Sequence, residues 1–203
     1  MQQGLLIVIS GPSGVGKNTI ITNLFEKLPN LSYSTSATTR YPRPNEIDGQ
    51  HYYFLSEENF LKKIEESDFL EWAKVYQHYY GTPKKQVLQL LNEGYDVVLD
   101  VDVQGALQIK KSFPDAVLIF LSPPSIGELK NRLKNRQTEA DSQIELRLQY
   151  IDTEFKTAPE YDYFIVNQEI DLTCSKIECI IHAEKCRVLR QESNFVNKIL
   201  FES

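Results

Sequence analysis

The hydrophobic positions fall into short apolar runs, separated by longer stretches in which apolar and polar residues alternate with helical spacing. Short apolar runs with β-branched members and turn residues at their ends predict buried strands. Four clear runs and one weaker alternating stretch cover residues 5–10, 96–102, 116–122, 163–167 and 32–36. Helical patterns cover about residues 17–28, 83–93, a segment from 124 onwards, and 172–200. Buried strands that alternate with helices predict an α/β fold with a five-stranded parallel sheet.

Two regions interrupt this alternation. Residues 36–82 are rich in Tyr, Thr, Pro and Arg and contain one helical pattern, so we expect a small inserted mixed or β subdomain there. Residues 126–156 are highly charged and mostly of helical pattern, so we expect a solvated helical excursion. The core of a single domain would then comprise residues 1–35, 83–125 and 157–203. Two excursions from a compact core suggest parts that move relative to it.

Composition narrows the class of protein. The chain has 203 residues, of which 41% are hydrophobic and 25% charged, as in globular proteins. Lys plus Arg number 22 and Asp plus Glu number 28, and this net charge of −6 argues against broad nucleic-acid binding. The sequence contains no run of about 18 apolar residues, so we expect no membrane span. The N-terminus has no charged region before its apolar stretch, so we expect no secretory signal and a cytoplasmic protein.

The cysteines suggest no special chemistry. Cys174, Cys179 and Cys186 are odd in number and lie outside any C-x-x-C spacing. We therefore expect reduced, small apolar residues in a helical segment rather than a metal site.

A glycine-rich loop follows the first predicted strand and opens a helix. It reads Gly11-Pro12-Ser13-Gly14-Val15-Gly16-Lys17-Asn18-Thr19, which is G-x-x-x-x-G-K in the expected context. The glycines let backbone N–H groups surround a phosphate, the helix N-terminus adds partial positive charge, and Lys17 adds a full charge. The strict pattern places Ser or Thr after the lysine to hold Mg²⁺, whereas this chain has Asn18 and then Thr19. The alternative is a glycine-rich turn with a chance lysine; the context favours a nucleoside triphosphate site with Mg²⁺.

Two carboxylates end the predicted strand 96–102. Asp100 and Asp102 are two residues apart, so on a strand they share a face. The carboxyl edge of a parallel sheet is where ligands bind. One carboxylate could hold a Mg²⁺ water and the other a substrate group, or both could be solvated strand-end residues. Gln104 and Gly105 then turn the chain into a helix.

The stretch 38–55 indicates a second anion. Arg40 and Arg43 lie close together in an otherwise acidic chain, and arginine forks bind phosphate through paired charged hydrogen bonds. The hydroxyls of Tyr52 and Tyr80 could reach the same phosphate. The alternative is a pair of surface arginines in a proline-rich loop.

With these residues the sequence resembles the guanylate kinases, which move a phosphate from ATP to GMP. The signature T-T-R-x-x-R-x-x-E-x-x-G-x-x-Y-x-F matches at every fixed position from Thr38 to Phe54. Further landmarks occur in the family's order: GPSGVGK at 11–17, FLEWA at 69–73, YYGT at 79–82, LDVDVQGA at 99–106 and YDYFIVN at 161–167. The resemblance covers roughly residues 4–190.

The resemblance implies a P-loop nucleoside monophosphate kinase core with an inserted GMP-binding subdomain at 36–82 and a helical lid at 126–156. It places around the GMP phosphate Ser36, Arg40, Arg43, Tyr52 and Tyr80. It gives the reading of guanine to Glu71, Thr82 and Asp102. The loop 11–19 would hold the ATP phosphates, and Asn167 would lie near the adenine. Lys17 and the lid arginines Arg132, Arg136 and Arg147 would be catalytic. Asp100 is the candidate to hold Mg²⁺ through water because of its place at the strand end, not because of the resemblance.

The chain departs from the family pattern in places. Asn18 stands where members often have Gly or Ser, Thr82 stands where some have Ser, and the lid turn Asn135-Arg136-Gln137 lacks the common glycines. Whether dGMP is also used stays open. We expect a monomer or a small homo-oligomer, with neither nucleic acid nor membrane as a partner.

The guanine assignment has a chemical reason. Guanine presents N1–H and N2 amino donors beside the O6 acceptor, so a carboxylate from Glu71 matches the donors and a hydroxyl from Thr82 can serve O6. Against adenine the carboxylate would be unpaired, and unpaired buried polar groups discriminate by about 10⁴–10⁵. The alternative for Glu71 is a solvated neighbour of Trp72.

Two other functions compete with the kinase. A non-catalytic guanylate-kinase-like module would bind a partner peptide, but such modules sit beside other domains and have lost parts of the nucleotide sites. This chain has no room for an extra domain and keeps Lys17 and the GMP residues. A kinase for another base is disfavoured by Glu71 and Asp102.

Overall fold

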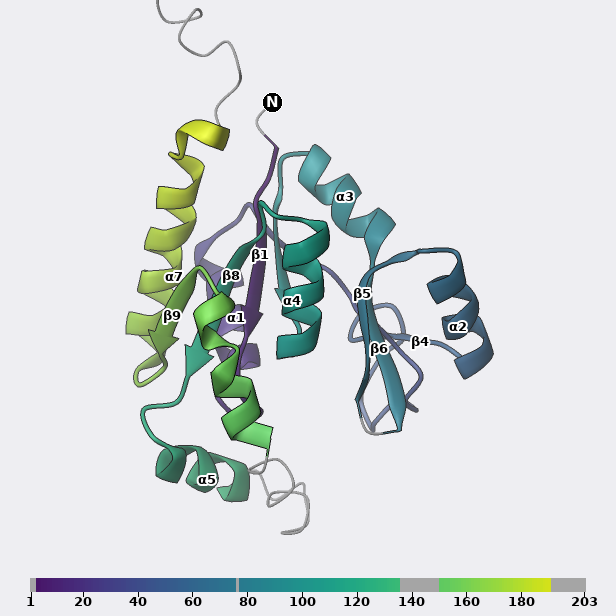
Figure 1. Ribbon diagram of the computed structural model, residues 1–203, viewed down its shortest axis with the longest axis horizontal. Helices are drawn as coiled ribbons and strands as arrows, with labels where there is room; N and C mark the ends of the chain where they lie inside the picture. The colour runs from purple at the N-terminus through teal and green to yellow at the C-terminus, as the bar shows by residue number, and fades with distance from the viewer. Residues whose placement is uncertain (1–2, 76, 136–149, 191–203) are drawn as a thin grey trace, which may run out of the picture.

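The computed structural model describes residues 3–75, 77–135 and 150–190, and Figure 1 shows their arrangement. A parallel sheet of five strands lies at the centre. Its order is β2 (Leu31–Tyr33), β7 (Asp96–Asp100), β1 (Leu6–Ser10), β8 (Val117–Ser122) and β9 (Tyr163–Val166). Every neighbouring pair is parallel, which confirms the predicted α/β fold. Because β1 is the middle strand, the loop that follows it lies at the centre of the sheet's carboxyl edge.

Helices cover both faces of this sheet because its strands are apolar on both sides. Along β1 the side chains alternate between two buried clusters, as the period of two in a strand requires. On one face, α1 (Lys17–Lys27) and α7 (Ile170–Lys185) contribute Ile20, Leu24, Ile177 and Ile181. On the other face, α3 (Lys84–Asn92) and α4 (Val103–Ser112) contribute Val87, Leu91, Ala106 and Ile109.

A second, four-stranded mixed sheet lies to one side of the core (Figure 1). Its order is β4 (Tyr53–Phe54), β3 (Ala37–Thr38), β6 (His78–Pro83) and β5 (Phe69–Val75), with β3 and β4 parallel and the other pairs antiparallel. The helix α2 (Glu57–Glu65) packs on it through the fully buried Phe60, which stacks on Phe69 at 4.5 Å between ring centroids. Burying such a side chain contributes about 1.5–3 kcal/mol. This sheet occupies the segment expected to hold mixed or β structure.

A helical pair lies beyond the carboxyl end of β8. It consists of α5 (Ile126–Asn135) and a helical segment at 150–156, whose buried residues Leu129, Leu133 and Ile151 form a separate small cluster with Phe155. The short 3₁₀ turn η1 (Ala158–Glu160) then leads into β9.

The boundary of β7 corrects one prediction. The strand ends at Asp100, and Asp102 is the N-cap of α4, where its carboxylate accepts a hydrogen bond from the Gly105 N–H at 2.8 Å. The prediction that both carboxylates lie on strand 96–102 was therefore wrong, because an aspartate that caps the next helix leaves the strand ladder. The weaker strand, expected at 32–36, is β2 at Leu31–Tyr33.

The last helix is shorter than predicted. It ends at Lys185 rather than near residue 200, and the turn η2 (Val188–Arg190) follows. Arg187 and Arg190 fold back onto Glu184, which explains why the chain leaves the helical path here. Of the helices in the described residues, none is long and apolar enough to cross a membrane. The three cysteines are free, with Cys174 buried and Cys179 and Cys186 exposed.

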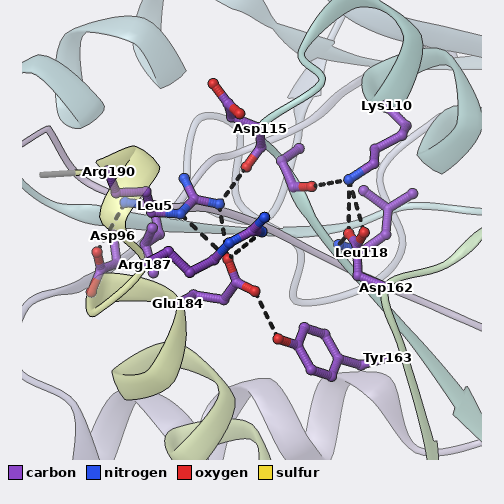
Figure 2. A network of polar contacts seen from close by, with 11 residues as sticks. Leu5, Asp96, Lys110, Asp115, Leu118, Asp162, Tyr163, Glu184, Arg187 and Arg190 are labelled. Carbon is purple, nitrogen blue, oxygen red and sulfur yellow. Dashed lines mark hydrogen bonds and ion pairs between the residues drawn. The ribbon is translucent and has the colours of Figure 1, made fainter.

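Figure 2 shows how α7 is fixed to the amino edge of the parallel sheet. The buried Glu184 accepts hydrogen bonds from the Tyr163 hydroxyl at 2.7 Å and from Arg187 and Arg190. Burial works against the charge of Glu184, but these bonds lower its pKa. Arg190 also donates to the Asp115 carbonyl at 2.8 Å, just before β8. The polar network of the amino edge is structural, and the carboxyl edge is left for the cleft described next.

Candidate functional site

A cleft of about 670 Å³ separates the core, the second sheet and the helical pair. Its wall contains the expected site residues Gly11, Ser13, Lys17, Ser36, Tyr52, Glu71, Tyr80, Asp100 and Asp102. Residues from three separate parts of the chain therefore meet in one cavity. Its size is that of a small-molecule site.

The glycine-rich loop forms a tight backbone cradle between β1 and α1. Gly11, Gly14 and Gly16 all have positive φ, which side-chain-bearing residues rarely adopt. A Cβ at Gly11 would lie 2.1 Å from the Leu121 carbonyl oxygen, so no other residue fits there. Gly16 is the N-cap of α1 and has no side-chain cap, so the first N–H groups of the helix are left for a ligand.

Lys17 lies at the base of this cradle, beside Asp100. Its ammonium donates to the Gly11 carbonyl at 3.1 Å and stands 3.7 Å from an Asp100 oxygen. Burial raises the pKa of Asp100, and the nearby Lys17 opposes that rise. Asn18 and Thr19 are exposed on the outside of the helix start. A basic group and a carboxylate thus face the same end of the cleft.

Residues distant in sequence hydrogen-bond to the backbone of the glycine-rich loop. The buried Asn167 donates to the Val15 carbonyl at 2.8 Å and accepts from the Thr173 hydroxyl at 3.0 Å. Arg132 donates to the carbonyls of Val15 and Asn167 at 3.3–3.4 Å and pairs with Glu128. Neither Asn167 nor Arg132 is on the cleft wall. Arg136 and Arg147 lie outside the described residues.

A buried carboxylate lies at the opposite end of the cleft. Glu71 on β5 is 6% exposed, and its Oε1 accepts a 2.6 Å hydrogen bond from the Thr82 hydroxyl on β6. Burial raises its pKa to about 7, which the Thr82 bond opposes and the charge of Asp102 reinforces. A Cβ on Gly105 of α4 would lie 2.7 Å from Glu71 Oε2, so the missing side chain leaves room for this carboxylate. Glu71 is not the solvated residue of the alternative interpretation, and Thr82 is fully buried beside it.

The arginines of the 38–54 stretch behave differently from one another. Arg40 forms a bidentate pair with Glu46 at 2.8 and 3.0 Å, and its guanidinium lies over the Tyr52 ring at 5.4 Å. The bond from Arg40 lowers the pKa of Glu46 to about 2. Arg43 is exposed, and its backbone N–H donates to Glu46 at 2.7 Å. Glu46 is part of the signature, yet its role as the partner of both arginines was not predicted.

Tyr52 and Tyr80 lie on the cleft wall, which includes neither Arg40 nor Arg43, and their ring centroids are 6.1 Å apart in an edge-to-face arrangement. Burial first, and then the charge of Asp100, raise the pKa of Tyr52, which keeps it a hydroxyl donor. Tyr33 at the end of β2 was not predicted, but burial and Asp100 raise its pKa too. Tyr33 therefore belongs to the same electrostatic environment.

The sequence-based prediction also missed much of the third wall. Residues from the helical pair face the cleft, namely Leu133, Tyr150, Ile151, Thr153 and Glu154. No local motif marks them, because their position depends on how the pair folds over the sheet edge. Among the described residues, no group of three or more His, Cys, Asp or Glu side chains could hold a metal ion by itself.

Comparisons with known proteins agree with this geometry. The family profile described as "Guanylate kinase" matches residues 3–184. The chain is 54% identical to the guanylate kinase of Caldanaerobacter subterraneus over 100% of this chain and 98% of that relative. It is 51% identical to that of Desulfitobacterium hafniense over 93% and 94% of the two chains. The crystal structure of guanylate kinase from Anaplasma phagocytophilum superposes with a TM-score of 0.80, at 31% identity, over 98% of this chain and 94% of that one.

Proposed function

Because the chain belongs to the guanylate kinase family, we propose that it transfers the γ-phosphate of ATP to GMP, giving ADP and GDP. The observation that carries this proposal is a single cleft with a phosphate loop at one end and the buried Glu71 at the other. One end suits a triphosphate and the other suits a base with hydrogen-bond donors. A non-catalytic module would have no use for both.

We assign the ATP phosphates to the loop 11–19, with Lys17 as the catalytic cation. The loop offers backbone N–H groups and the N-terminus of α1, both of which favour an anion. Asn167 stays in this site as a support of the loop, because its amide is bonded to Val15. Asn18 and Thr19 would take part through their backbone more than through their exposed side chains.

We assign GMP to the side of the cleft formed by the second sheet. Glu71 and Asp102 would accept hydrogen bonds from the guanine donors, and Thr82 would orient Glu71 and serve the same edge of the base. The phosphate of GMP would lie against Ser36, Arg40, Arg43, Tyr52 and Tyr80. Arg40 is suited to this because Glu46 and the ring of Tyr52 hold its fork in place.

The reaction needs positioning and charge neutralisation more than covalent help from the protein. An oxygen of the GMP phosphate attacks the γ-phosphorus in line, the new P–O bond forms, and the bond to the β-phosphate oxygen breaks to release ADP. Lys17 stabilises charge on the transferred group, and we give the same role to Arg136 and Arg147. Arg132 bonds the Val15 and Asn167 carbonyls off the cleft wall, so it would take this role only after closure has moved it toward the cleft. Closure of the second sheet and the helical pair over the core would exclude water, which would otherwise accept the phosphate.

We propose Mg²⁺ as the cofactor that accompanies ATP. The residues present fit it: Asp100 supplies the oxygen chemistry that Mg²⁺ prefers, at the end of the cleft where Lys17 lies. When bound, Mg²⁺ neutralises charge on the ATP phosphates. Asp100 would hold it through water, since a single carboxylate does not make a complete metal site.

We further propose a cytoplasmic enzyme that acts as a monomer or a small homo-oligomer, with no nucleic-acid or membrane partner. The net charge of −6 supports the absence of a nucleic-acid partner, because it disfavours polyanion binding. Use of dGMP is left to the assay below.

A coupled assay that detects ADP tests the proposal. Purified protein is incubated with ATP and Mg²⁺ plus GMP, dGMP, AMP, CMP or UMP. We expect turnover with GMP and at least a hundredfold lower kcat/KM with the three other ribonucleotides, on the order expected when a buried polar group is left unpaired. Equal turnover of AMP would refute the guanine assignment, and no turnover with any acceptor would favour the binding module.

A further inference from the structure

The two carboxylates assigned to guanine come from different parts of the fold. Glu71 lies on β5 of the second sheet, whereas Asp102 caps α4 of the core. Neither holds the other, because Asp102 accepts from Gly105 and Glu71 accepts from Thr82. Their separation therefore depends on how β5 and α4 are connected.

Gln108 on α4 makes that connection. Its Oε1 accepts from the Trp72 N–H at 3.2 Å, and its Nε2 donates to the Trp72 carbonyl at 3.0 Å. Trp72 directly follows Glu71, and β5 is the edge strand of its sheet. The planar amide of Gln108 thus takes the place of a neighbouring strand at one residue, with both a donor and an acceptor.

Three residues of α4, its N-cap included, contribute to the site. Asp102, Gly105 and Gln108 are spaced by three residues, so each lies next to the following one along the helix. Asp102 faces the cleft, Gly105 leaves room for the Glu71 carboxylate, and Gln108 holds the backbone beside Glu71. A shift of β5 along α4 would move Glu71 relative to both other residues.

We infer that Gln108 is a positioning residue for guanine selection, which fixes where β5 presents Glu71 relative to Asp102. This inference rests on the proposed role of Glu71. Gln108 touches no substrate and acts only through the Trp72 backbone. Because its side chain is exposed, water replaces part of what is lost when the two bonds are removed, so the effect is moderate.

The test is Gln108→Leu, which keeps the approximate size of the side chain and removes both hydrogen bonds. We expect the KM for GMP to rise about 3- to 10-fold, while kcat and the KM for ATP change less than twofold. The preference for GMP over IMP, measured as a ratio of kcat/KM, should fall, because hypoxanthine lacks the N2 amino donor that a well-placed Glu71 would accept. Gln89→Leu is the matched control, since Gln89 is an exposed helical glutamine bonded to Glu93 and lies off the cleft wall.

The Glu71→Gln background separates positioning from general stability. If Gln108 acts through Glu71, adding Gln108→Leu to Glu71→Gln should change GMP kinetics less than twofold. The inference is overturned if Gln108→Leu matches Gln89→Leu in GMP kinetics, or if it lowers Tm and kcat with the GMP-to-IMP ratio unchanged. If Glu71→Gln itself leaves GMP kinetics intact, the assignment of the guanine site fails first, and that result is distinct from a failure of Gln108 alone.

Discussion

The two ends of the cleft, assigned to ATP and to GMP, differ in the groups that form them. The ATP end consists mainly of backbone, with Gly11, Gly14 and Gly16 in conformations that only glycine adopts easily and one lysine at the base. The GMP end consists of ionisable side chains that pair with one another, such as Arg40 with Glu46. A backbone site depends on few side chains, whereas a side-chain site depends on many and on the pH. The predictions below test this difference.

The largest effect is expected for Lys17→Ala, since Lys17 supplies the full positive charge of the glycine-rich loop beside its backbone N–H groups. By comparison with the loss of one preorganised donor, kcat should fall by about 10²–10³ with the fold preserved. Steady-state kinetics and circular dichroism would measure both. Lys27→Ala at the other end of α1, where the lysine is paired with Asp171, is the control. Near-normal turnover of a folded Lys17→Ala protein would contradict the phosphate-loop assignment.

Glu71→Gln should damage GMP use and leave ATP use intact. The amide places an NH₂ group near the guanine donors at nearly constant volume, so an attractive contact becomes repulsive. A charge-assisted hydrogen bond is worth about 1.5–3 kcal/mol, which predicts a loss of roughly 10- to 150-fold in kcat/KM for GMP. Varying each substrate in turn would show whether the KM for ATP moves. An equal change for both substrates would mean that the two ends are not independent.

The pKa of Glu71 predicts a pH dependence confined to the GMP end. With a pKa of about 7, only about a tenth of the carboxylate is charged at pH 6, so the KM for GMP should rise about tenfold from pH 8 to pH 6. GMP's own phosphate titrates near pH 6, so Glu71→Gln is the control and should show only that smaller dependence. Identical pH profiles for the two proteins would refute the prediction.

The same raised pKa has a defined sign for stability. The folded state holds the proton more tightly than the unfolded state, so this contribution is present below pH 4.5 and is lost as the pH rises through about 7. Thermal unfolding of nucleotide-free protein should show this loss relative to Glu71→Gln.

Glu46→Gln should have a smaller effect than Glu71→Gln. It keeps a hydrogen-bond acceptor but removes the charge that holds the Arg40 fork, so we expect the KM for GMP to rise about 3- to 10-fold. Glu58→Gln on the exposed face of α2 controls for the loss of one charge. A KM equal to that of this control would show that Arg40 is held well enough by the rings of Tyr52 and Phe54.

Asn18→Gly should have the smallest effect. The Asn18 side chain is exposed, and an amide oxygen is a weaker Mg²⁺ ligand than a carboxylate. We expect kcat and the Mg²⁺ concentration for half-activity to change less than about twofold, because Mg²⁺ readily keeps several waters. Titration of Mg²⁺ at fixed ATP would measure this. A large rise in the required Mg²⁺ would make Asn18 a ligand.

Local patterns were enough to predict the sheet and the position of the glycine-rich loop. Four apolar runs and one alternating stretch predicted the five parallel strands, and the strand–loop–helix order placed Lys17 at the carboxyl edge. These features depend on neighbours in sequence. The family signature in turn indicated Arg40 and Tyr52, although not that Glu46 would hold Arg40.

Features that depend on competition between local contacts, or on tertiary packing, were not predicted. The strand pattern continued through Asp102, but the capping bond to Gly105 outweighed it. The helical pattern continued past Lys185, but α7 ends there, and Arg187 and Arg190 donate hydrogen bonds to Glu184. The cleft residues Tyr150 and Glu154 have no sequence signal, since only the folded position of their helix turns them inward.

The link between Asn167 and Val15 joins residues 152 positions apart, and it has a consequence for protein synthesis. The ribosome makes the glycine-rich loop first and Asn167, which directly follows β9, near the end. During translation the loop therefore lacks the support of β9 and α7, and a chain that stops before residue 167 cannot complete it. We therefore expect the loop to reach its final conformation only after β9 and α7 have been added.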